Sequence, residues 1–139
     1  MNLIGGRVLA LLLLLPAVSW AQTNVRTAED IVSTREMERI NWMEFKEVVP
    51  TKINTVLLPT GTMEPHGVVN NGADNTAPFA IAKHIAKRVN AMIAPTLPYG
   101  ITGSMEAYPG AFTISEEAYR PFVKQLLEGL AKNGFRNII

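Results

Sequence analysis

Three side chains that could bind a divalent metal ion lie close together in this 139-residue sequence: Glu64, His66 and Asp74. Glu64 and His66 are two residues apart, so on an extended segment both side chains point to the same side. Two carboxylates and one imidazole are suitable ligands for Zn²⁺ or Mn²⁺. A carboxylate shared by two such ions could position a water between them, and two-metal sites activate such a water as a nucleophile. The residue types therefore predict metal-dependent hydrolysis.

The same residues also have simpler interpretations. An Asp directly before a helix commonly serves only as an N-cap, which by itself would explain Asp74. A single histidine in a loop is more often solvated than metal-bound. The second histidine of the chain, His84, stands among Lys83, Lys87 and Arg88 in a predicted helix. We expect His84 on the surface and not as a ligand.

The three residues fall in a loop between a predicted strand and a predicted helix. An apolar run over 53–59, rich in β-branched residues, predicts a buried strand, and helical spacing of apolar residues over 76–89 predicts an amphipathic helix. The connection over 60–75 is much longer than the about 2–6 residues usual for such a link. In open α/β sheets, ligands bind where strands end in such loops.

The remaining elements continue an alternation of strands and helices. A short helix is predicted over 37–49 and a second strand over 91–94. Thr113 and Glu116 have the spacing of a capping box, which predicts a helix behind them, and Gly134 suits a left-handed helix stop. A third apolar run begins at Phe135. This order predicts an α/β fold in which a parallel sheet with right-handed crossovers is flanked by helices.

The amino terminus has the layout of a secretory signal peptide. Arg7 precedes an apolar run over 8–15, Pro16 breaks that run, and Ser19 and Ala21 place small residues where a signal peptidase cleaves. The run is shorter than the about 20 residues of a membrane-spanning helix. We expect a signal peptide over 1–21, a mobile lead-in over 22–34 and a single domain over 35–139. The protein would then be exported, to the periplasm or the exterior, with an uncleaved anchor as the alternative.

Charge and cysteine content exclude some partners and ligands. The chain has 13 Lys and Arg against 12 Asp and Glu, a balance that gives no reason to expect nucleic acid or an anionic membrane surface as a partner. Cysteine is absent, so neither disulfides nor thiolate-bound zinc contribute to the fold.

Several segments, taken in order, resemble the creatininase family. The stretch after the first predicted strand resembles its first signature, in which a strand ending in Pro and Gly is followed by Glu-x-His-Gly and then by Gly-x-Asp at the start of a helix. The matching segments are Leu58-Pro59-Thr60-Gly61-Thr62-Met63-Glu64-Pro65-His66-Gly67, Gly72-Ala73-Asp74, Pro98-Tyr99-Gly100, Pro109-Gly110-Ala111-Phe112-Thr113-Ile114 and Gly134-Phe135-Arg136. The resemblance extends from about residue 35 to the end of the chain.

The resemblance implies a three-layer α/β/α domain that is incomplete at its carboxyl end, with two divalent metal ions, Zn²⁺ or Mn²⁺. Glu64 and His66 would be terminal ligands and Asp74 the bridging one, with the remaining ligands expected beyond Ile139. A metal-bridging hydroxide would attack the amide carbon of a cyclic or other non-peptide amide, one ion would polarise the carbonyl oxygen, and the C–N bond would then break. Many family members are hexamers, so the full-length protein would be a homo-oligomer. Neither the substrate nor a general acid can be identified from the sequence.

One segment departs from the family pattern. The family commonly has Gly-Pro-His-Leu-Pro after Glu-x-His, whereas this chain has Gly67-Val68-Val69-Asn70-Asn71 and lacks the second histidine. This difference leaves open an alternative function, a non-catalytic or inactive exported domain that binds a small ligand in the same cleft.

Overall fold

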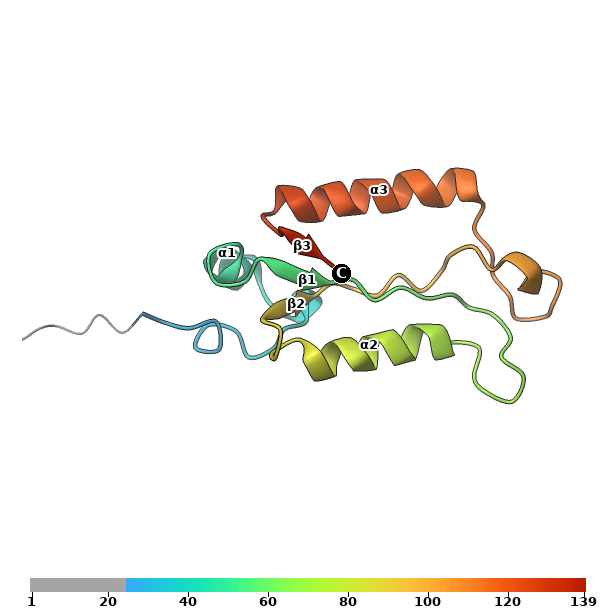
Figure 1. Cartoon of the computed structure of the whole chain (residues 1–139), viewed down its shortest axis with the longest axis horizontal. Helices are drawn as coiled ribbons and strands as arrows, with labels where there is room; N and C mark the ends of the chain where they lie inside the picture. Colours follow the sequence, from blue (N-terminus) through green and yellow to red (C-terminus); the bar gives the residue numbers. More distant parts are fainter. Residues whose placement is uncertain (1–24) are drawn as a thin grey trace, which may run out of the picture.

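The computed structural model describes residues 25–139 and has a three-stranded parallel sheet between two helical layers (Figure 1). The strands are β1 (Thr55–Leu57), β2 (Ala91–Ile93) and β3 (Asn137–Ile138), in the spatial order β2-β1-β3. Val56 is the register partner of both Met92 and Ile138. The α/β class and the parallel sheet are confirmed, although each strand is shorter than its apolar run.

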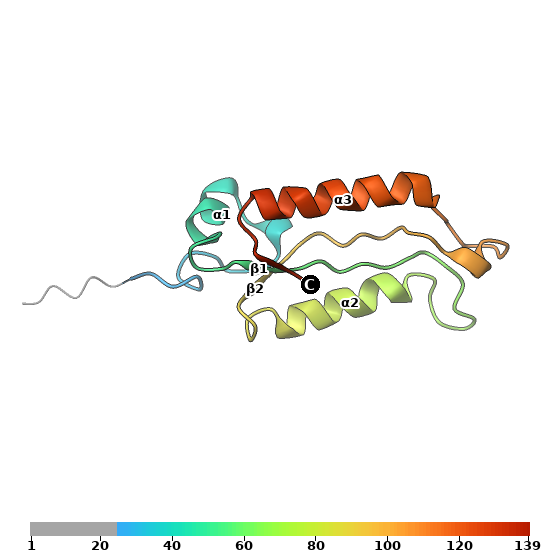
Figure 2. The same cartoon turned by 45° about the horizontal axis from the view of Figure 1, so that its top comes forward.

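The two faces of the sheet contribute to two separate cores. Val56 and Met92 belong to a cluster that includes Leu130 of α3 (Glu116–Lys132) and Phe135. Leu57, Ala91 and Ile93 point to the opposite face, where they meet Ala82 and Ala86 at the carboxyl end of α2 (Ala73–Ile85). Successive strand residues alternate between faces, which explains this division. α2 and α3 therefore cover opposite sides of the sheet, and both views show this (Figures 1 and 2).

The helix predicted over 37–49 is divided into two pieces. A single 3₁₀ turn, η1 (Met37–Arg39), precedes α1 (Trp42–Val48). Between them Asn41 caps α1: its side chain accepts hydrogen bonds from the backbone N–H groups of Met43 and Glu44, at 2.9 and 3.0 Å. The Glu44 carboxylate accepts one in return from the Asn41 N–H, at 2.9 Å. This capping box fixes the start of α1.

The capping box predicted from Thr113 and Glu116 is wrong. The N-cap of α3 is Ser115, and its side chain makes no capping hydrogen bond. The Thr113 hydroxyl instead accepts a hydrogen bond from the backbone N–H of Thr102 at 3.2 Å, because Thr113 pairs with Gly100 as a parallel bridge. At the other end of α3 the prediction is confirmed, since Gly134 has a φ of +104°, in the left-handed region.

The long connections that follow β1 and β2 run side by side beyond the sheet and hold each other in place. Thr60 pairs with Leu97 in a parallel bridge, and Met63 pairs with Phe112 in an antiparallel one. The second connection contains one 3₁₀ turn, η2 (Gly103–Met105). These bridges extend the sheet pattern past the strand ends and explain how so long a loop after β1 is held in place.

The predicted signal peptide over 1–21 lies outside the described residues. The predicted mobile lead-in over 22–34 is described from residue 25, and within it Ala28 and Val32 are buried in the core that contains Val56. Glu36 then pairs with Ile93 alongside β2. Within residues 25–139, every helix falls short of the length or apolar character that crossing a bilayer requires.

Candidate metal centre

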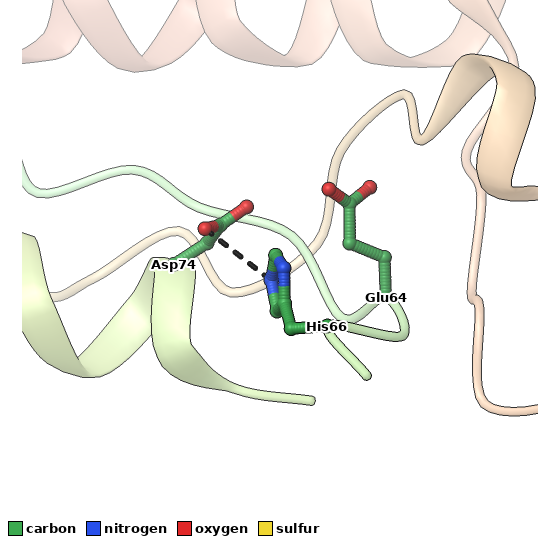
Figure 3. A group of neighbouring side chains, drawn as sticks. All are labelled: Glu64, His66 and Asp74. Carbon is green, nitrogen blue, oxygen red and sulfur yellow. Dashed lines mark ion pairs between the residues drawn. The ribbon is translucent and has the colours of Figure 1, made fainter. Parts of the chain in front are cut away.

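Glu64, His66 and Asp74 come together beyond the carboxyl end of β1 (Figure 3). One ligand atom from each residue lies within 4.8 Å of the others, and all three side chains are half-buried. Figure 3 shows the Glu64 and His66 side chains rising from the same loop, with Asp74 reaching toward His66 from the start of α2. The structure therefore unites the three residues that the sequence predicted as ligands.

Local backbone contacts place the two loop residues. The backbone N–H of Glu64 donates to the carbonyl of Asn71 at 3.2 Å, which closes the loop across its base. His66 begins a tight turn in which the Val69 N–H donates to the His66 carbonyl at 3.3 Å. Gly67 occupies this turn with a φ of +65°, a conformation that favours glycine. The residues of this turn after His66 are exposed to solvent, whereas His66 itself is half-buried.

Asp74 lies inside the first turn of α2 and not before the helix. The N-cap is Gly72, and α2 begins at Ala73, three residues earlier than the apolar pattern predicted. Asp74 is therefore no side-chain N-cap, and that simpler interpretation is wrong. An acidic residue in the first turn still benefits from the positive end of the helix dipole. Its carboxylate is free to face the loop.

The His66 imidazole has the features of a metal ligand. Its Nε2 atom is buried and has no hydrogen-bond partner among the described residues. The nearest carboxylate oxygen is Asp74 Oδ1, at 3.4 Å. Two atoms that each lie about 2.1 Å from a tetrahedral zinc ion are separated by about 3.4 Å. The spacing thus suits two ligands of one ion better than a direct hydrogen bond, and the donor set fits Zn²⁺ or Mn²⁺.

Two neighbouring residues that the sequence analysis did not single out support the site. Thr62 Oγ1 donates to Asp74 Oδ2 at 3.0 Å. The Asn75 side-chain amide donates to the Thr62 carbonyl and to the Pro98 carbonyl, both at 3.2 Å. No sequence pattern marks Thr62 or Asn75 as functional, although Asn75 directly follows Asp74 and Thr62 is two residues before Glu64. Together they connect both long loops to the start of α2.

A cleft of about 540 Å³ adjoins the site between β1 and α2. Its size falls in the range of small-molecule pockets. Among the described residues in its wall, Asp74 has the one charged side chain, beside Thr60, Thr62 and apolar side chains such as Ile81 and Ile139. His84 lies on the exposed surface of α2, as the sequence predicted.

Comparison with known proteins supports the resemblance. Residues 38–139 match the Creatininase family, described as creatinine amidohydrolase. A creatinine amidohydrolase from Pseudomonas putida is 26% identical over 106 residues, which are 72% of this chain and 41% of that protein.

Solved structures agree with the family match. A creatininase variant of the Zn-Zn type and a structure titled Creatininase Mn each have a TM-score of 0.70 and 25% identity, covering 76% of this chain and 43% of the other. The chain thus spans less than half the length of these relatives. With the family match over most of its residues and the shared fold, the chain belongs to the creatininase family.

Proposed function

We propose that this protein is an exported metal-dependent amidohydrolase that hydrolyses the C–N bond of a cyclic or other non-peptide amide. Glu64, His66 and Asp74 would hold divalent metal ions, Zn²⁺ or Mn²⁺. The observation that carries this proposal is the buried His66 Nε2, which has no hydrogen-bond partner among the described residues and faces Asp74 Oδ1 at 3.4 Å. Membership of the creatininase family gives the reaction class.

Each of the three residues has a distinct role in this proposal. In Figure 3 the Glu64 and His66 side chains come from one loop and Asp74 from the start of α2. Following the family resemblance, Asp74 would be shared between two ions, while Glu64 and His66 would each bind one. When bound, such ions supply Lewis acidity, which polarises an amide carbonyl and makes water a stronger acid. Three side chains do not complete two coordination shells, since zinc usually takes four ligands. Further donors must therefore join these three.

The proposed substrate class rests on the relatives and on the cleft beside the site. The curated relative is named for creatinine, a small cyclic amide, and the structural relatives are titled creatininases. The cleft beside Asp74 has a volume suited to a small molecule and a mainly apolar wall. A small amide whose carbonyl reaches a metal ion held by Asp74 would fit this arrangement.

Metal analysis with a matched pair of variants tests the proposal. The purified protein is stripped with a chelator, reloaded with Zn²⁺ or Mn²⁺, and assayed for bound metal and for hydrolysis of creatinine and other small cyclic amides. We expect about two ions per chain, and at least a tenfold loss of metal affinity in His66→Ala. His84→Ala, which removes the exposed histidine of α2, should retain both ions. Equal binding by the two variants would contradict the assignment.

The turn over 67–71 favours one alternative function. Val68 and Val69 have no polar side-chain group to offer the site, and they lie at the surface, Val68 fully exposed and Val69 about half exposed. A domain that binds a small ligand without hydrolysing it would bind metal and amide but show no turnover. Product analysis by mass spectrometry after prolonged incubation with the reloaded protein separates this outcome from catalysis.

Export and assembly are parts of the same proposal. Amino-terminal sequencing of the protein recovered from the periplasm or medium should begin at Gln22, if the signal peptide over 1–21 is removed. A start at Met1 in the cell interior would exclude export. Light scattering after size exclusion tests the expected homo-oligomer, for which a hexamer is the proposed state.

A further inference from the structure

We propose that Thr62 is a positioning residue for the metal centre, acting through Asp74. This inference rests on the proposed function, because it assumes that Asp74 is a metal ligand. Thr62 Oγ1 donates to Asp74 Oδ2 at 3.0 Å, while the other carboxylate oxygen, Asp74 Oδ1, lies 3.4 Å from His66 Nε2. The two oxygens thus have different partners. The hydroxyl fixes the rotation of the carboxylate so that Oδ1 faces the imidazole.

Thr62 can direct Asp74 because its own backbone is held. Its carbonyl accepts a hydrogen bond from the Asn75 side chain at 3.2 Å, and Asn75 follows Asp74 in the first turn of α2. Asn75 also donates to the Pro98 carbonyl, which ties the second long connection to the same point. Two successive residues of α2 therefore contact Thr62, one at its hydroxyl and one at its carbonyl. A ligand held through such partners keeps its orientation before the metal arrives.

The two branches of the Thr62 side chain make different contacts. The hydroxyl contacts Asp74, whereas the methyl group, Cγ2, lies 3.2 Å from the position that a Cβ on Gly100 would occupy. The methyl group therefore packs against the neighbouring connection. Thr62→Val keeps the branched shape and removes the hydroxyl, while Thr62→Ser keeps the hydroxyl and removes the methyl group. These two variants separate a positioning role from a packing role.

Metal titration of the purified protein provides the first test. Mn²⁺ binding to the chelator-stripped protein is measured by calorimetry and by electron paramagnetic resonance. We expect Thr62→Val to weaken the affinity by about 10–100-fold, the usual effect of losing an outer hydrogen-bond partner, and Thr62→Ser to stay within about threefold. Thr76→Val is the matched control, since within residues 25–139 the exposed Thr76 hydroxyl bonds only to the Ala73 carbonyl of α2. Unchanged affinity in Thr62→Val, or a larger loss in Thr62→Ser, would overturn the proposal.

A metal-free crystal structure provides a second test that does not depend on the proposed function. In the unsubstituted protein, Asp74 Oδ1 should face His66 without any ion, and in Thr62→Val the carboxylate should rotate or occupy several positions. A carboxylate that keeps its orientation in metal-free Thr62→Val refutes the positioning role, whatever the titration gives. If the unsubstituted protein binds no ion, the proposed function fails, and this structure still decides whether Thr62 orients Asp74.

Discussion

Gly61 and Asp74 approach so closely that no side chain fits between them. A Cβ built on Gly61 would lie 2.3 Å from the Asp74 carbonyl oxygen and 2.4 Å from the Asn75 side-chain oxygen. The loop after β1 and the first turn of α2 therefore meet backbone to backbone. This contact brings the segment that carries Glu64 and His66 up to the helix that carries Asp74.

Gly61→Ala should disrupt the metal centre. The obstructing atom at 2.3 Å is a backbone oxygen, so either the loop or the start of α2 must move. We expect the Mn²⁺ affinity to fall at least tenfold and the free energy of unfolding to fall by about 1–3 kcal/mol, the usual range for overpacking. Calorimetric titration and urea unfolding measure the two effects.

Gly129→Ala is the control for that substitution. Gly129 lies within α3, and a Cβ there meets no atom within 4 Å. The same change should leave metal affinity unaltered and raise the free energy of unfolding by about 0.5–1 kcal/mol, because alanine favours helix. If Gly61→Ala behaved like Gly129→Ala, the close approach would have no role in the site.

Divalent metal should stabilise the protein through Asp74. An ion that binds only the folded state raises the free energy of unfolding by about 2.7 kcal/mol at a hundredfold excess over its Kd. Adding Zn²⁺ or Mn²⁺ to the stripped protein should therefore raise its melting temperature, and a chelator should reverse the change. In Asp74→Asn the increase should be lost, because the amide is a poor substitute for a carboxylate that faces His66 at 3.4 Å.

Scanning calorimetry of both proteins, with and without metal, measures this difference. An equal rise in Asp74→Asn would place the stabilising ion elsewhere. Mg²⁺, which prefers octahedral oxygen coordination, serves as a control ion and should have a smaller effect.

The parts of the fold that follow from periodicity were predictable. The alternation of Val56 and Leu57 between two cores, and the apolar side of α2, are direct consequences of strand and helix geometry. The convergence of Glu64, His66 and Asp74 followed from residue types, from their place after a strand and from the family resemblance. Element ends were less accurate, and α2 begins at Ala73 instead of residue 76.

The contacts that connect distant segments were not predictable. Thr113 has the spacing of a capping residue, yet its hydroxyl accepts a hydrogen bond from the backbone N–H of Thr102. This partner is determined by the pairing of two segments in the folded structure and not by the local sequence. Thr62 likewise gives no sign in the sequence that it bonds to Asp74. Local patterns describe neighbours along the chain, whereas these hydrogen bonds depend on how two loops lie together.

Substitutions at Asn41, Thr113 and Glu116 test which of these residues caps a helix. Asn41→Ala removes an acceptor for two backbone N–H groups and should cost about 1 kcal/mol of unfolding free energy. Thr113→Val removes the acceptor of the Thr102 N–H and should cost about 1 kcal/mol as well. Glu116→Ala should cost less than about 0.5 kcal/mol, because it is exposed.

Urea unfolding of the three variants provides the comparison. A capping box between Thr113 and Glu116 would instead make these two substitutions similarly costly, and the double variant would lose little beyond either one. That pattern would contradict the pairing of Thr113 with Thr102.

The segment before the first helical turn should contribute a pH-dependent stability through Glu29. Its backbone N–H and then the Arg35 guanidinium hold the pKa of the Glu29 carboxyl below its usual value, while the Arg35 side chain is only 4% exposed. A carboxyl whose pKa is lowered on folding stabilises the protein above its unfolded pKa, about 4.3, and loses that contribution as the pH falls through the folded value. Glu29→Gln should therefore reduce the unfolding free energy at pH 7 by about 1 kcal/mol, since Glu29 itself is half exposed.

The difference between Glu29→Gln and the unsubstituted protein should shrink steadily as the pH falls below the unfolded pKa of about 4.3 and through the lowered folded pKa, because protonation removes the Glu29 charge. Urea unfolding at pH 7, 5, 4 and 3 follows it, with Glu38→Gln, a change at an exposed residue of η1, as the control. If the difference in unfolding free energy persists unchanged at pH 3, the effect comes from the shape of the Glu29 side chain and not from its charge. No difference at pH 7 would mean that the Glu29–Arg35 pair adds nothing to the stability that the burial of Ala28 and Val32 gives this segment.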